Sequence, residues 1–253
     1  MKIIYSLLSA CLVITSFRAI SAENVTITFP SSDDLIITAD TYFQHKTKST
    51  PLIVLFHQAG WSRGEYLEIA PKLNKLGFNC IAIDLRSGKS VNDIDNETAL
   101  KAFQADKQTR YIDTLPDIVA ALRYARSQFS DSKIIAWGSS YSAALVLQIA
   151  GNQPDLVDGV LAFAPGEYFA KQGKSKSWIR DSATHINVPV FITSARDEQS
   201  KWSAIFDSIK SKQKYSFIPN TKGNHGSRAL WEQFEDSDEY WKAVNEFLTN
   251  NFL

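Results

Sequence analysis

KIIAWGSSYSAALVLQIAG, residues 133–151, is the stretch on which the rest of the chain depends. It begins with a short apolar run at 134–137 and turns sharply through residues 138–142. It continues to Gly151 as an apolar segment rich in alanine and leucine, which are good helix formers. A strand, a tight turn and a helix in this order are typical of the turn that carries a nucleophilic serine.

The turn itself has the residue sizes that such a nucleophile needs. Ser140 lies between Gly138 and Ser142, and both are small, as a strained backbone at this position requires. Glycine is usual at the last of these positions, so Ser142 departs from the pattern while keeping its size. Ser140 would lie at a helix start, where free N–H groups favour negative charge. The alternative interpretation is an ordinary Gly-Ser turn with an N-capping serine.

The composition is that of an ordinary globular protein. The 253 residues suit one large domain or two small ones, and the hydrophobic fraction of 44% is enough for a buried core. The chain has 27 basic and 27 acidic residues and no basic stripe that would indicate nucleic acid as a partner. No His-x-x-x-His or paired-cysteine spacing indicates a metal site. Cys80 lies in an apolar run and is expected to be a buried, unreactive thiol.

Residues 1–22 are expected to be a secretory signal peptide. Lys2 supplies the positive start, an apolar run covers residues 3–17, and Ile20-Ser21-Ala22 suits a cleavage site. The run is too short for a membrane span, so the mature protein is expected to be secreted or periplasmic. Cys11 ends a segment that resembles a bacterial lipoprotein box, which leaves lipidation as the less favoured alternative.

The rest of the chain alternates between strand and helix patterns. Residues 25–29 and 35–42 predict an antiparallel pair of strands at the start. The further predicted strands are 51–56, 80–85, 134–137, 156–164, 188–194 and 215–218, and the helices that alternate with them include 65–76, 109–129, 202–209 and 231–247. Residues 86–105 are polar and are expected to form a loop with a short helix at most. This alternation predicts an α/β fold over residues 23–253, as a single domain with a mostly parallel sheet and helices on both faces.

A nucleophilic serine needs a base that takes its proton and a carboxylate that orients the base. In an open α/β sheet, such residues lie in loops at the carboxyl ends of strands. Of the four histidines, only His225 follows the last predicted strand, and glycines on both sides give its loop freedom to turn the imidazole inward. Asp197, after the preceding strand, is the preferred acid, and Glu198 and Glu167 are the alternatives. The resulting chain order is serine, aspartate, histidine.

With this order, the chain resembles the α/β hydrolases, and it is most similar to their small members of the dienelactone-hydrolase type. The resemblance rests on the turn around Ser140, on the loop His57-Gln58-Ala59-Gly60, on the acid loop and on the final histidine loop. It covers nearly everything from about residue 25 to the C-terminus. It implies the α/β-hydrolase fold with about eight strands, hydrolysis through an acyl-enzyme intermediate, and no cofactor.

The resemblance also implies where an oxyanion hole would lie. The donors in such enzymes are a backbone N–H of the loop after the third strand and the N–H that follows the nucleophile. Carried over, these are Ala59, or Gln58, and Tyr141. The usual His-Gly start of the loop is His57-Gln58 here, a second departure from the pattern. His57 is expected to hold the loop in place and not to react.

The sequence defines the substrate pocket less clearly. The residues expected to border the site or to line an acyl or alcohol pocket are Trp61, Glu167, Tyr168, Phe169 and Trp178. Ordinary packing or a surface position is an equally good interpretation of each aromatic residue. Residues 171–187 are too few for a large helical lid, so the site is expected to be open.

These observations predict a secreted serine hydrolase that cleaves a small ester or a related acyl bond. The expected partner is a small-molecule acyl substrate, without nucleic acid. One alternative is a catalytically inactive member of the fold that is used for binding. Another is a small serine peptidase, because Ser140-Tyr141 resembles the pair found in prolyl-oligopeptidase-type enzymes. The physiological substrate and the oligomeric state stay open at this stage.

Overall fold

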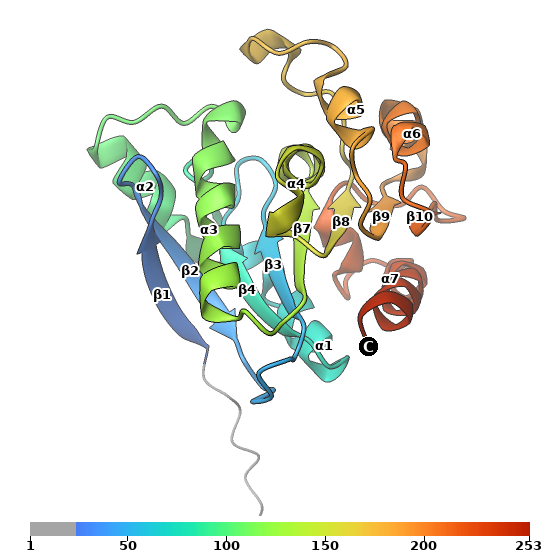
Figure 1. Ribbon diagram of the computed structural model, residues 1–253, viewed down its shortest axis with the longest axis horizontal. Helices are drawn as coiled ribbons and strands as arrows, with labels where there is room; N and C mark the ends of the chain where they lie inside the picture. The colour runs from blue at the N-terminus through green and yellow to red at the C-terminus, as the bar shows by residue number, and fades with distance from the viewer. Residues whose placement is uncertain (1–23) are drawn as a thin grey trace, which may run out of the picture.

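The computed structural model describes residues 24–253, which form one eight-stranded sheet and a separate two-stranded one (Figure 1). The predicted signal peptide and Cys11 lie outside the described residues. The order of the large sheet is β1-β2-β4-β3-β7-β8-β9-β10. Its strands are β1 (Val25–Pro30), β2 (Ile36–Tyr42), β3 (Leu52–Phe56), β4 (Asn79–Ile83), β7 (Ile134–Ser139), β8 (Gly159–Phe163), β9 (Val190–Thr193) and β10 (Lys214–Phe217).

The large sheet is parallel except at one edge. β1 pairs antiparallel with β2, and β2 pairs antiparallel with β4. All the pairs from β4 to β10 are parallel. The predicted α/β fold, a mostly parallel eight-stranded sheet with an antiparallel pair at its start, is therefore confirmed. Because parallel strands end at the same edge of a sheet, the loops that follow β3, β7, β9 and β10 meet there.

Helices cover both faces of this sheet, as predicted. On one face, an apolar cluster lies under α3 (Leu115–Gln128), α4 (Tyr141–Asn152), α5 (Trp178–Ala183) and α6 (Gln199–Ser208). On the other face, a second cluster lies under α1 (Ile69–Lys75) and α7 (Ser237–Phe252). Figure 1 shows α3 and α4 in front of the sheet. Short 3₁₀ turns connect the elements, namely η1 (Arg63–Tyr66), η2 (Tyr111–Thr114), η3 (Pro154–Leu156), η4 (Ala170–Gln172), η5 (Arg196–Glu198) and η6 (Ser227–Leu230).

β7 shows why these strands are continuous apolar runs in the sequence. Ile134 and Ala136 belong to the cluster under α3 and α4, whereas Ile135 and Trp137 belong to the cluster on the opposite face. All four side chains are fully buried. Because side chains alternate between the two faces of a strand, a strand covered on both sides needs apolar residues at every position.

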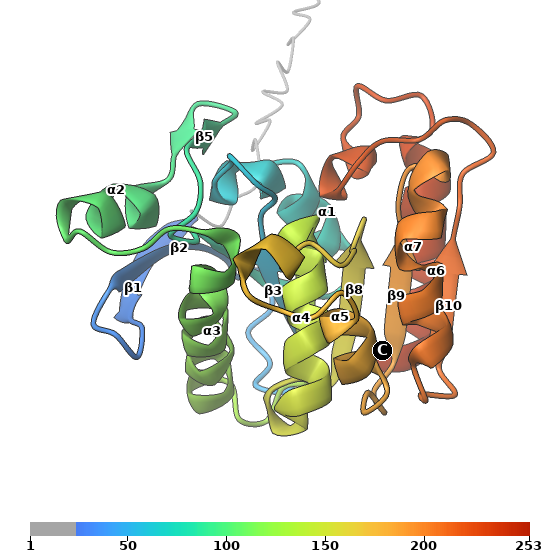
Figure 2. The same cartoon turned by 90° about the horizontal axis from the view of Figure 1, so that it is seen from above.

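Residues 86–105 and the start of the last helix differ most from their prediction, and the predicted helix at 65–76 is divided into η1 and α1. Residues 86–105 are more ordered than expected and contain the hairpin strands β5 (Ser90–Val91) and β6 (Ile94–Asp95) and the helix α2 (Glu97–Gln104), which Figure 2 shows beside β1 and β2. The last helix begins at Ser237 and not at residue 231. Trp231 stays outside the helix because its indole N–H donates to the Glu65 carbonyl at 3.0 Å and its ring stacks on Trp61.

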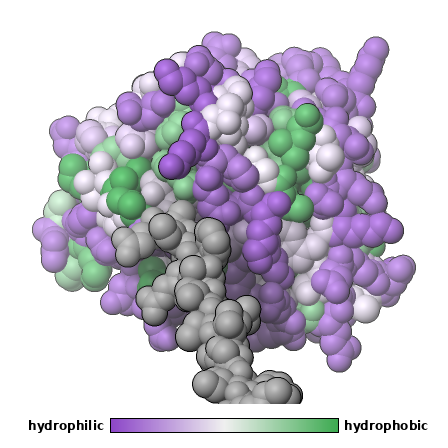
Figure 3. All heavy atoms as spheres, turned by 90° about the horizontal axis from the view of Figure 1, so that it is seen from below, coloured by the Kyte–Doolittle hydropathy of each residue, from purple (hydrophilic) through white to green (hydrophobic). Residues whose placement is uncertain are grey.

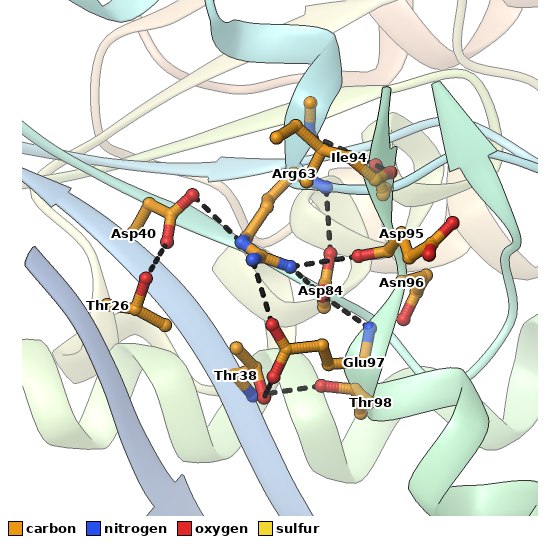
Figure 4. Close-up of polar contacts among 12 residues, drawn as sticks. Thr26, Thr38, Asp40, Arg63, Asp84, Ile94, Asp95, Asn96, Glu97 and Thr98 are labelled. Carbon is orange, nitrogen blue, oxygen red and sulfur yellow. Dashed lines mark hydrogen bonds and ion pairs between the residues drawn. The ribbon is translucent and has the colours of Figure 1, made fainter. Parts of the chain in front are cut away.

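A partly buried network of charges around Arg63 fixes η1 and α2 to the sheet (Figure 4). The guanidinium donates to Asp40 on β2 at 2.8 Å, to Asp84 after β4 at 2.6 Å and to Glu97 on α2 at 3.1 Å. Asp84 also accepts the backbone N–H groups of Arg63 and Glu97, both at 2.8 Å. Burial raises the pKa of Asp84 to about 6, although the charge of Arg63 opposes this shift. The network joins η1 to segments that are distant in the sequence, and these bonds hold η1 in its position against the sheet.

The surface is mainly hydrophilic on the face that Figure 3 shows, with several separate hydrophobic patches. On α2, the large apolar side chains Leu100 and Phe103 are exposed, Phe103 to 83%. Part of the apolar surface of α2 is therefore uncovered. Among the helices of residues 24–253, none is both long and apolar enough to span a membrane.

Candidate active site

Ser140 lies in the sharp turn between β7 and α4. Its backbone has φ 61° and ψ −118°, and residues other than glycine rarely adopt a positive φ. The Ser140 N–H donates to the Phe163 carbonyl at 2.7 Å, which ties the turn to β8. A Cβ at Gly138 would lie 2.5 Å from the Ala143 Cα, so only glycine fits there. The predicted strained turn is therefore confirmed.

Ser142, at the position where glycine is usual, holds the turn together with its hydroxyl. Its Oγ accepts the Ser139 N–H at 2.8 Å and lies 2.8 Å from the Phe56 carbonyl oxygen at the end of β3. The hydroxyl can donate to Phe56 while it accepts from Ser139. The Ser142 hydroxyl, which glycine would lack, thus connects the turn to β3, the strand that precedes the predicted oxyanion loop.

His225, in the loop after β10, lies between a hydroxyl and a carboxylate. Its Nε2 is 2.8 Å from Ser140 Oγ, and its Nδ1 is 2.7 Å from Glu198 Oε1. A carboxylate can only accept, so Nδ1 carries the proton and Nε2 is free to accept the hydroxyl proton of Ser140. Gly226 takes φ 74°, which turns the chain immediately after the histidine. The structure therefore brings together Ser140 and His225, two of the predicted site residues.

Glu198, and not Asp197, faces the imidazole. Both residues belong to η5, and successive residues of a 3₁₀ helix point about 120° apart, so only one of two neighbours can face His225. Asp197 is exposed, whereas the Glu198 side chain is only 10% exposed. The Arg196 N–H donates to the Lys222 carbonyl at 2.9 Å, which fixes this register. The geometry corrects the preference for Asp197 in favour of the alternative acid Glu198.

The surroundings of Glu198 favour its ionised form. Burial raises the pKa of Glu198. The hydrogen bond with His225 and the ammonium of Lys201, 3.1 Å from Oε1, together lower this pKa by more than burial raises it, so the net shift is downward. Its second oxygen, Oε2, is buried and has no hydrogen-bond partner in the part of the chain that the structure describes. The carboxylate is therefore charged at neutral pH, and its negative charge faces the imidazole.

His57 is buried and holds the loop after β3, as predicted. Its Nε2 accepts the Leu85 N–H at 3.0 Å, so its Nδ1 carries the proton and donates to the Gln58 carbonyl at 2.8 Å. Asn96 Nδ2 lies 3.2 Å from the same Nε2. Burial lowers the pKa of His57 to about 4, although its backbone hydrogen bonds oppose the shift. The ring is therefore neutral and both of its nitrogens are engaged.

Of the two N–H groups predicted for the oxyanion loop, one is occupied and the other has no partner within the described residues, 24–253. The Gln58 N–H donates to the buried Glu65 carboxylate at 2.8 Å, which removes Gln58 from the candidate donors. The Gln58 carbonyl accepts from His57, and in a trans peptide the next N–H points the opposite way. The Ala59 N–H therefore points away from His57, without a hydrogen-bond partner in residues 24–253. Tyr141 is the first residue of α4, where an N–H has no partner within the helix.

Among the predicted pocket residues, Tyr168 lies beside the site. Its hydroxyl donates to the Ala164 carbonyl at 2.7 Å. Burial raises the pKa of Tyr168, the charge of Glu198 raises it further, and a contact with the Ser140 hydroxyl lowers it, which reflects how near the phenol is to both groups. The phenol therefore forms part of the wall around Ser140.

Two other predicted pocket residues have structural roles. Phe169 is buried in the core and packs edge-to-face on Trp178, with 5.2 Å between the ring centroids. Glu167 accepts the backbone N–H groups of Ile179 and Arg180, at 3.0 and 2.8 Å. The carboxylate therefore caps the start of α5 and is not available as an acid for His225. The packing interpretation holds for Phe169, and Glu167 is removed from the candidate acids.

Sequence reasoning missed two aromatic residues near the oxyanion loop. Tyr111 stacks on Tyr141, with 4.6 Å between the ring centroids. A cleft of about 430 Å³ is lined by Gly60 of this loop, by Tyr111 and by the exposed Phe103, among others. Trp61, which was predicted for the pocket, is half-buried and its ring stacks on that of Trp231. The available signal was the presence of aromatic residues in a segment that is otherwise polar.

The arrangement contains the parts that acyl transfer requires. They are a hydroxyl, an imidazole and a carboxylate in hydrogen-bonded order, and two backbone N–H groups that have no partner among residues 24–253. Within residues 24–253, no group of three or more His, Cys, Asp or Glu side chains is placed to hold a metal ion.

Comparisons with known proteins agree with this fold. A family model described as alpha/beta hydrolase fold matches residues 51–230. The crystal structure of a dienelactone hydrolase from Anabaena variabilis is similar with a TM-score of 0.70 and 12% sequence identity, over 91% of this chain and 99% of that one.

Two further solved structures are similar over most of the chain. The Pyrococcus furiosus esterase Pf2001 gives a TM-score of 0.67 at 19% identity, over 90% of this chain and 92% of that one. Est1E from Butyrivibrio proteoclasticus, solved with ferulic acid bound, gives a TM-score of 0.64 at 15% identity, over 89% of this chain and 98% of that one. No curated protein sequence matches significantly. At these identities the likeness to the solved structures is one of fold.

Proposed function

The chain belongs to the α/β hydrolase family, and we propose that it is a serine hydrolase that cleaves a small ester or a related acyl bond. The observation that carries the proposal is the position of His225, whose two ring nitrogens lie 2.8 Å from Ser140 Oγ and 2.7 Å from Glu198 Oε1. A histidine in this position can take the serine proton while the carboxylate stabilises the resulting charge.

In the proposed reaction, Ser140 Oγ attacks the acyl carbon while His225 Nε2 accepts the hydroxyl proton. The tetrahedral intermediate then breaks the bond to the alcohol, which leaves with the proton from His225, and the acyl group remains on Ser140. A water molecule that gives its proton to the same imidazole attacks the acyl-enzyme next. The acid is released, and Ser140 regains its proton from His225.

The Ala59 and Tyr141 N–H groups are proposed to bind the oxyanion of both tetrahedral intermediates. Support comes from their availability, because neither has a hydrogen-bond partner in residues 24–253 whereas the neighbouring Gln58 N–H is occupied. One such donor contributes about 3 kcal/mol to the stabilisation of a transition state. The cleft of about 430 Å³ adjoins the oxyanion loop at Gly60 and has the size of a small-molecule site, although its lining does not include Ser140 or His225.

The mature protein is proposed to act outside the cytoplasm, either secreted or in the periplasm. The support is the sequence of residues 1–22, which has the pattern of a signal peptide with cleavage after Ala22. N-terminal sequencing of the exported protein should begin at Glu23, and a lipid-modified Cys11 would replace this proposal with the lipoprotein alternative.

A fluorophosphonate probe tests the proposed function, because it reacts with an activated serine. The purified protein should be labelled at one site, which peptide mapping should identify as Ser140, and Ser140→Ala should remove the label. Ser130→Ala, which changes an exposed serine, is the control and should keep it. Label on Ser139, or label that survives Ser140→Ala, would refute the assignment. Turnover of p-nitrophenyl esters of varied length, beside aminoacyl arylamides, then distinguishes an esterase from a peptidase.

A further inference from the structure

Glu65 is a buried carboxylate behind the site that the proposed reaction does not use. It lies in η1, and its side chain is fully buried. Its Oε2 accepts the Gln58 N–H at 2.8 Å, and its Oε1 accepts the Ser139 hydroxyl at 2.7 Å. Gln58 precedes Ala59 in the oxyanion loop, and Ser139 precedes Ser140 in the turn. One carboxylate is therefore bonded to the loop that carries one oxyanion donor and to the turn that carries the nucleophile.

Ser139 extends this contact to the loop that carries His225. Its Oγ accepts the Ser227 N–H at 2.9 Å while its proton is donated to Glu65. The histidine loop packs closely here, because a Cβ on Gly226 would lie 2.6 Å from Ser139 Oγ. Three segments that are distant in the sequence thus meet at one carboxylate and one hydroxyl.

The position of Glu65 is fixed independently of these contacts. Its backbone carbonyl accepts the Trp231 indole N–H at 3.0 Å, and Arg63 in the same short helix is held by the charge network of Figure 4. Burial raises the pKa of Glu65 to about 7, against hydrogen bonds from Ser139 and Gln58 and the charge of Arg228. Burying a carboxylate is costly, so packing alone would be served better by an apolar side chain of similar volume.

We propose that Glu65 is a positioning residue that aligns the Ala59 N–H and the His225 loop with Ser140 by holding Gln58 and Ser139. The inference rests on the proposed function of this site. While the Gln58 N–H is bound to Glu65 and its carbonyl to His57, the peptide that carries the Ala59 N–H cannot rotate. The oxyanion donor is then in place before substrate arrives, which is the condition for strong stabilisation.

Glu65→Gln tests this role because it keeps the shape and changes the bonding. A carboxylate offers two acceptor oxygens, whereas a glutamine offers one acceptor and one donor. The variant can accept the Gln58 N–H or the Ser139 hydroxyl but not both. Because the oxyanion hole acts in the transition state, kcat should fall about 10- to 100-fold while KM changes little. Affinity for a trifluoromethyl ketone, which forms a tetrahedral adduct on serine, should fall by the same factor as kcat/KM.

Asp117→Asn is the matched control. Asp117 is also a fully buried carboxylate, but it lies on α3 and is bonded to Arg86. The Asp117→Asn variant should have a melting temperature as low as that of Glu65→Gln, and its kcat should equal that of the wild type. Ser139→Ala is the second test variant, because it removes the hydroxyl that joins Glu65 to the Ser227 N–H and keeps the bond between Glu65 and the Gln58 N–H. Its effect on kcat should add only in part to that of Glu65→Gln, because both substitutions disturb the Glu65–Ser139 hydrogen bond and only Glu65→Gln can also disturb the bond to Gln58.

Amide hydrogen exchange gives a readout that does not depend on activity. Exchange at Gln58, at Ser227 or at both, followed by NMR, should be at least about tenfold faster in Glu65→Gln than in Asp117→Asn. Wild-type kcat in Glu65→Gln, an equal loss in Asp117→Asn, or exchange that is unchanged at both Gln58 and Ser227 overturns the proposal. If Glu65→Gln does not fold, Ser139→Ala decides, and unchanged kcat and Ser227 exchange overturn it. A wild type that cleaves no ester refutes the proposed function, and the exchange data then still decide about Glu65.

Discussion

Replacing Glu198 by glutamine should lower turnover about a thousandfold and leave the fold intact. The Glu198 oxygen lies 2.7 Å from Nδ1 of His225, and glutamine keeps the size and an acceptor oxygen while it removes the negative charge. The charge matters once His225 has taken the proton of Ser140, because only then is the ring an imidazolium. The substitution therefore acts on the transition state and not on the resting enzyme.

The magnitude follows from the distance between the charges. For charge centres about 4 Å apart and an effective dielectric constant of about 20, the attraction is about 4 kcal/mol. A change of about 1.4 kcal/mol in the barrier corresponds to a factor of ten in rate, so this loss corresponds to about a thousandfold in kcat. KM should change little, because the interaction is absent from the bound ground state.

The assay is steady-state hydrolysis of a p-nitrophenyl ester at neutral pH, with the melting temperature of each variant measured alongside. Asp197→Asn is the matched control, since it removes a carboxylate from the same turn on an exposed side chain, and kcat should stay within about twofold of wild type. A crippled Asp197→Asn beside a nearly normal Glu198→Gln would refute the reasoning, because the acid would then be the neighbouring residue of η5.

Three further predictions concern the base, the metal requirement and the pH dependence of stability. His225→Ala should lower kcat on the same ester at least about a thousandfold, and a near-normal rate would remove His225 as the base. Exhaustive treatment with EDTA should leave hydrolysis unchanged, and activity that is lost and then restored by a metal would overturn this expectation. Burial raises the pKa of Glu65 from 4.5 to about 7, so the folded state binds this proton more tightly and stability should fall by at most about 3 kcal/mol as the pH rises between these values. Urea unfolding across that range measures the fall, which should be smaller in Glu65→Gln; an equal fall in both proteins would contradict it.

The layers of the fold were predictable because they depend on local patterns. β3, β4 and β7 are covered on both faces, so each contains an apolar run, at 52–56, 80–83 and 134–137, that identifies it directly. The turn at Ser140 was predictable for a similar reason, since residue size limits what can stand at 138 and 142. His225 was found by elimination, as the only histidine after the last predicted strand.

The remaining parts of the site depend on direction and on long-range contacts. Asp197 and Glu198 are adjacent, and the spacing from the strand end does not say which of them faces the imidazole, because a short 3₁₀ turn decides it. Glu65 is a single acidic residue in a helix pattern, and only the folded structure brings it to Gln58 and Ser139. Residues 86–105 were predicted to be mainly a loop because they are polar. Their order depends on ion pairs such as Arg63–Glu97, which join segments that are distant in the sequence.

The backbone conformation that Ser140 needs for its proposed role lowers the thermal stability of the folded protein. A residue other than glycine at φ 61° destabilises the folded state by about 1 to 3 kcal/mol, which is a large share of the roughly 5 to 15 kcal/mol that typically holds a domain folded. Glycine would relieve this strain and remove the nucleophile at the same time. The most stable version of this fold is therefore not the reactive one, and selection for thermal stability alone would act against the hydroxyl at residue 140.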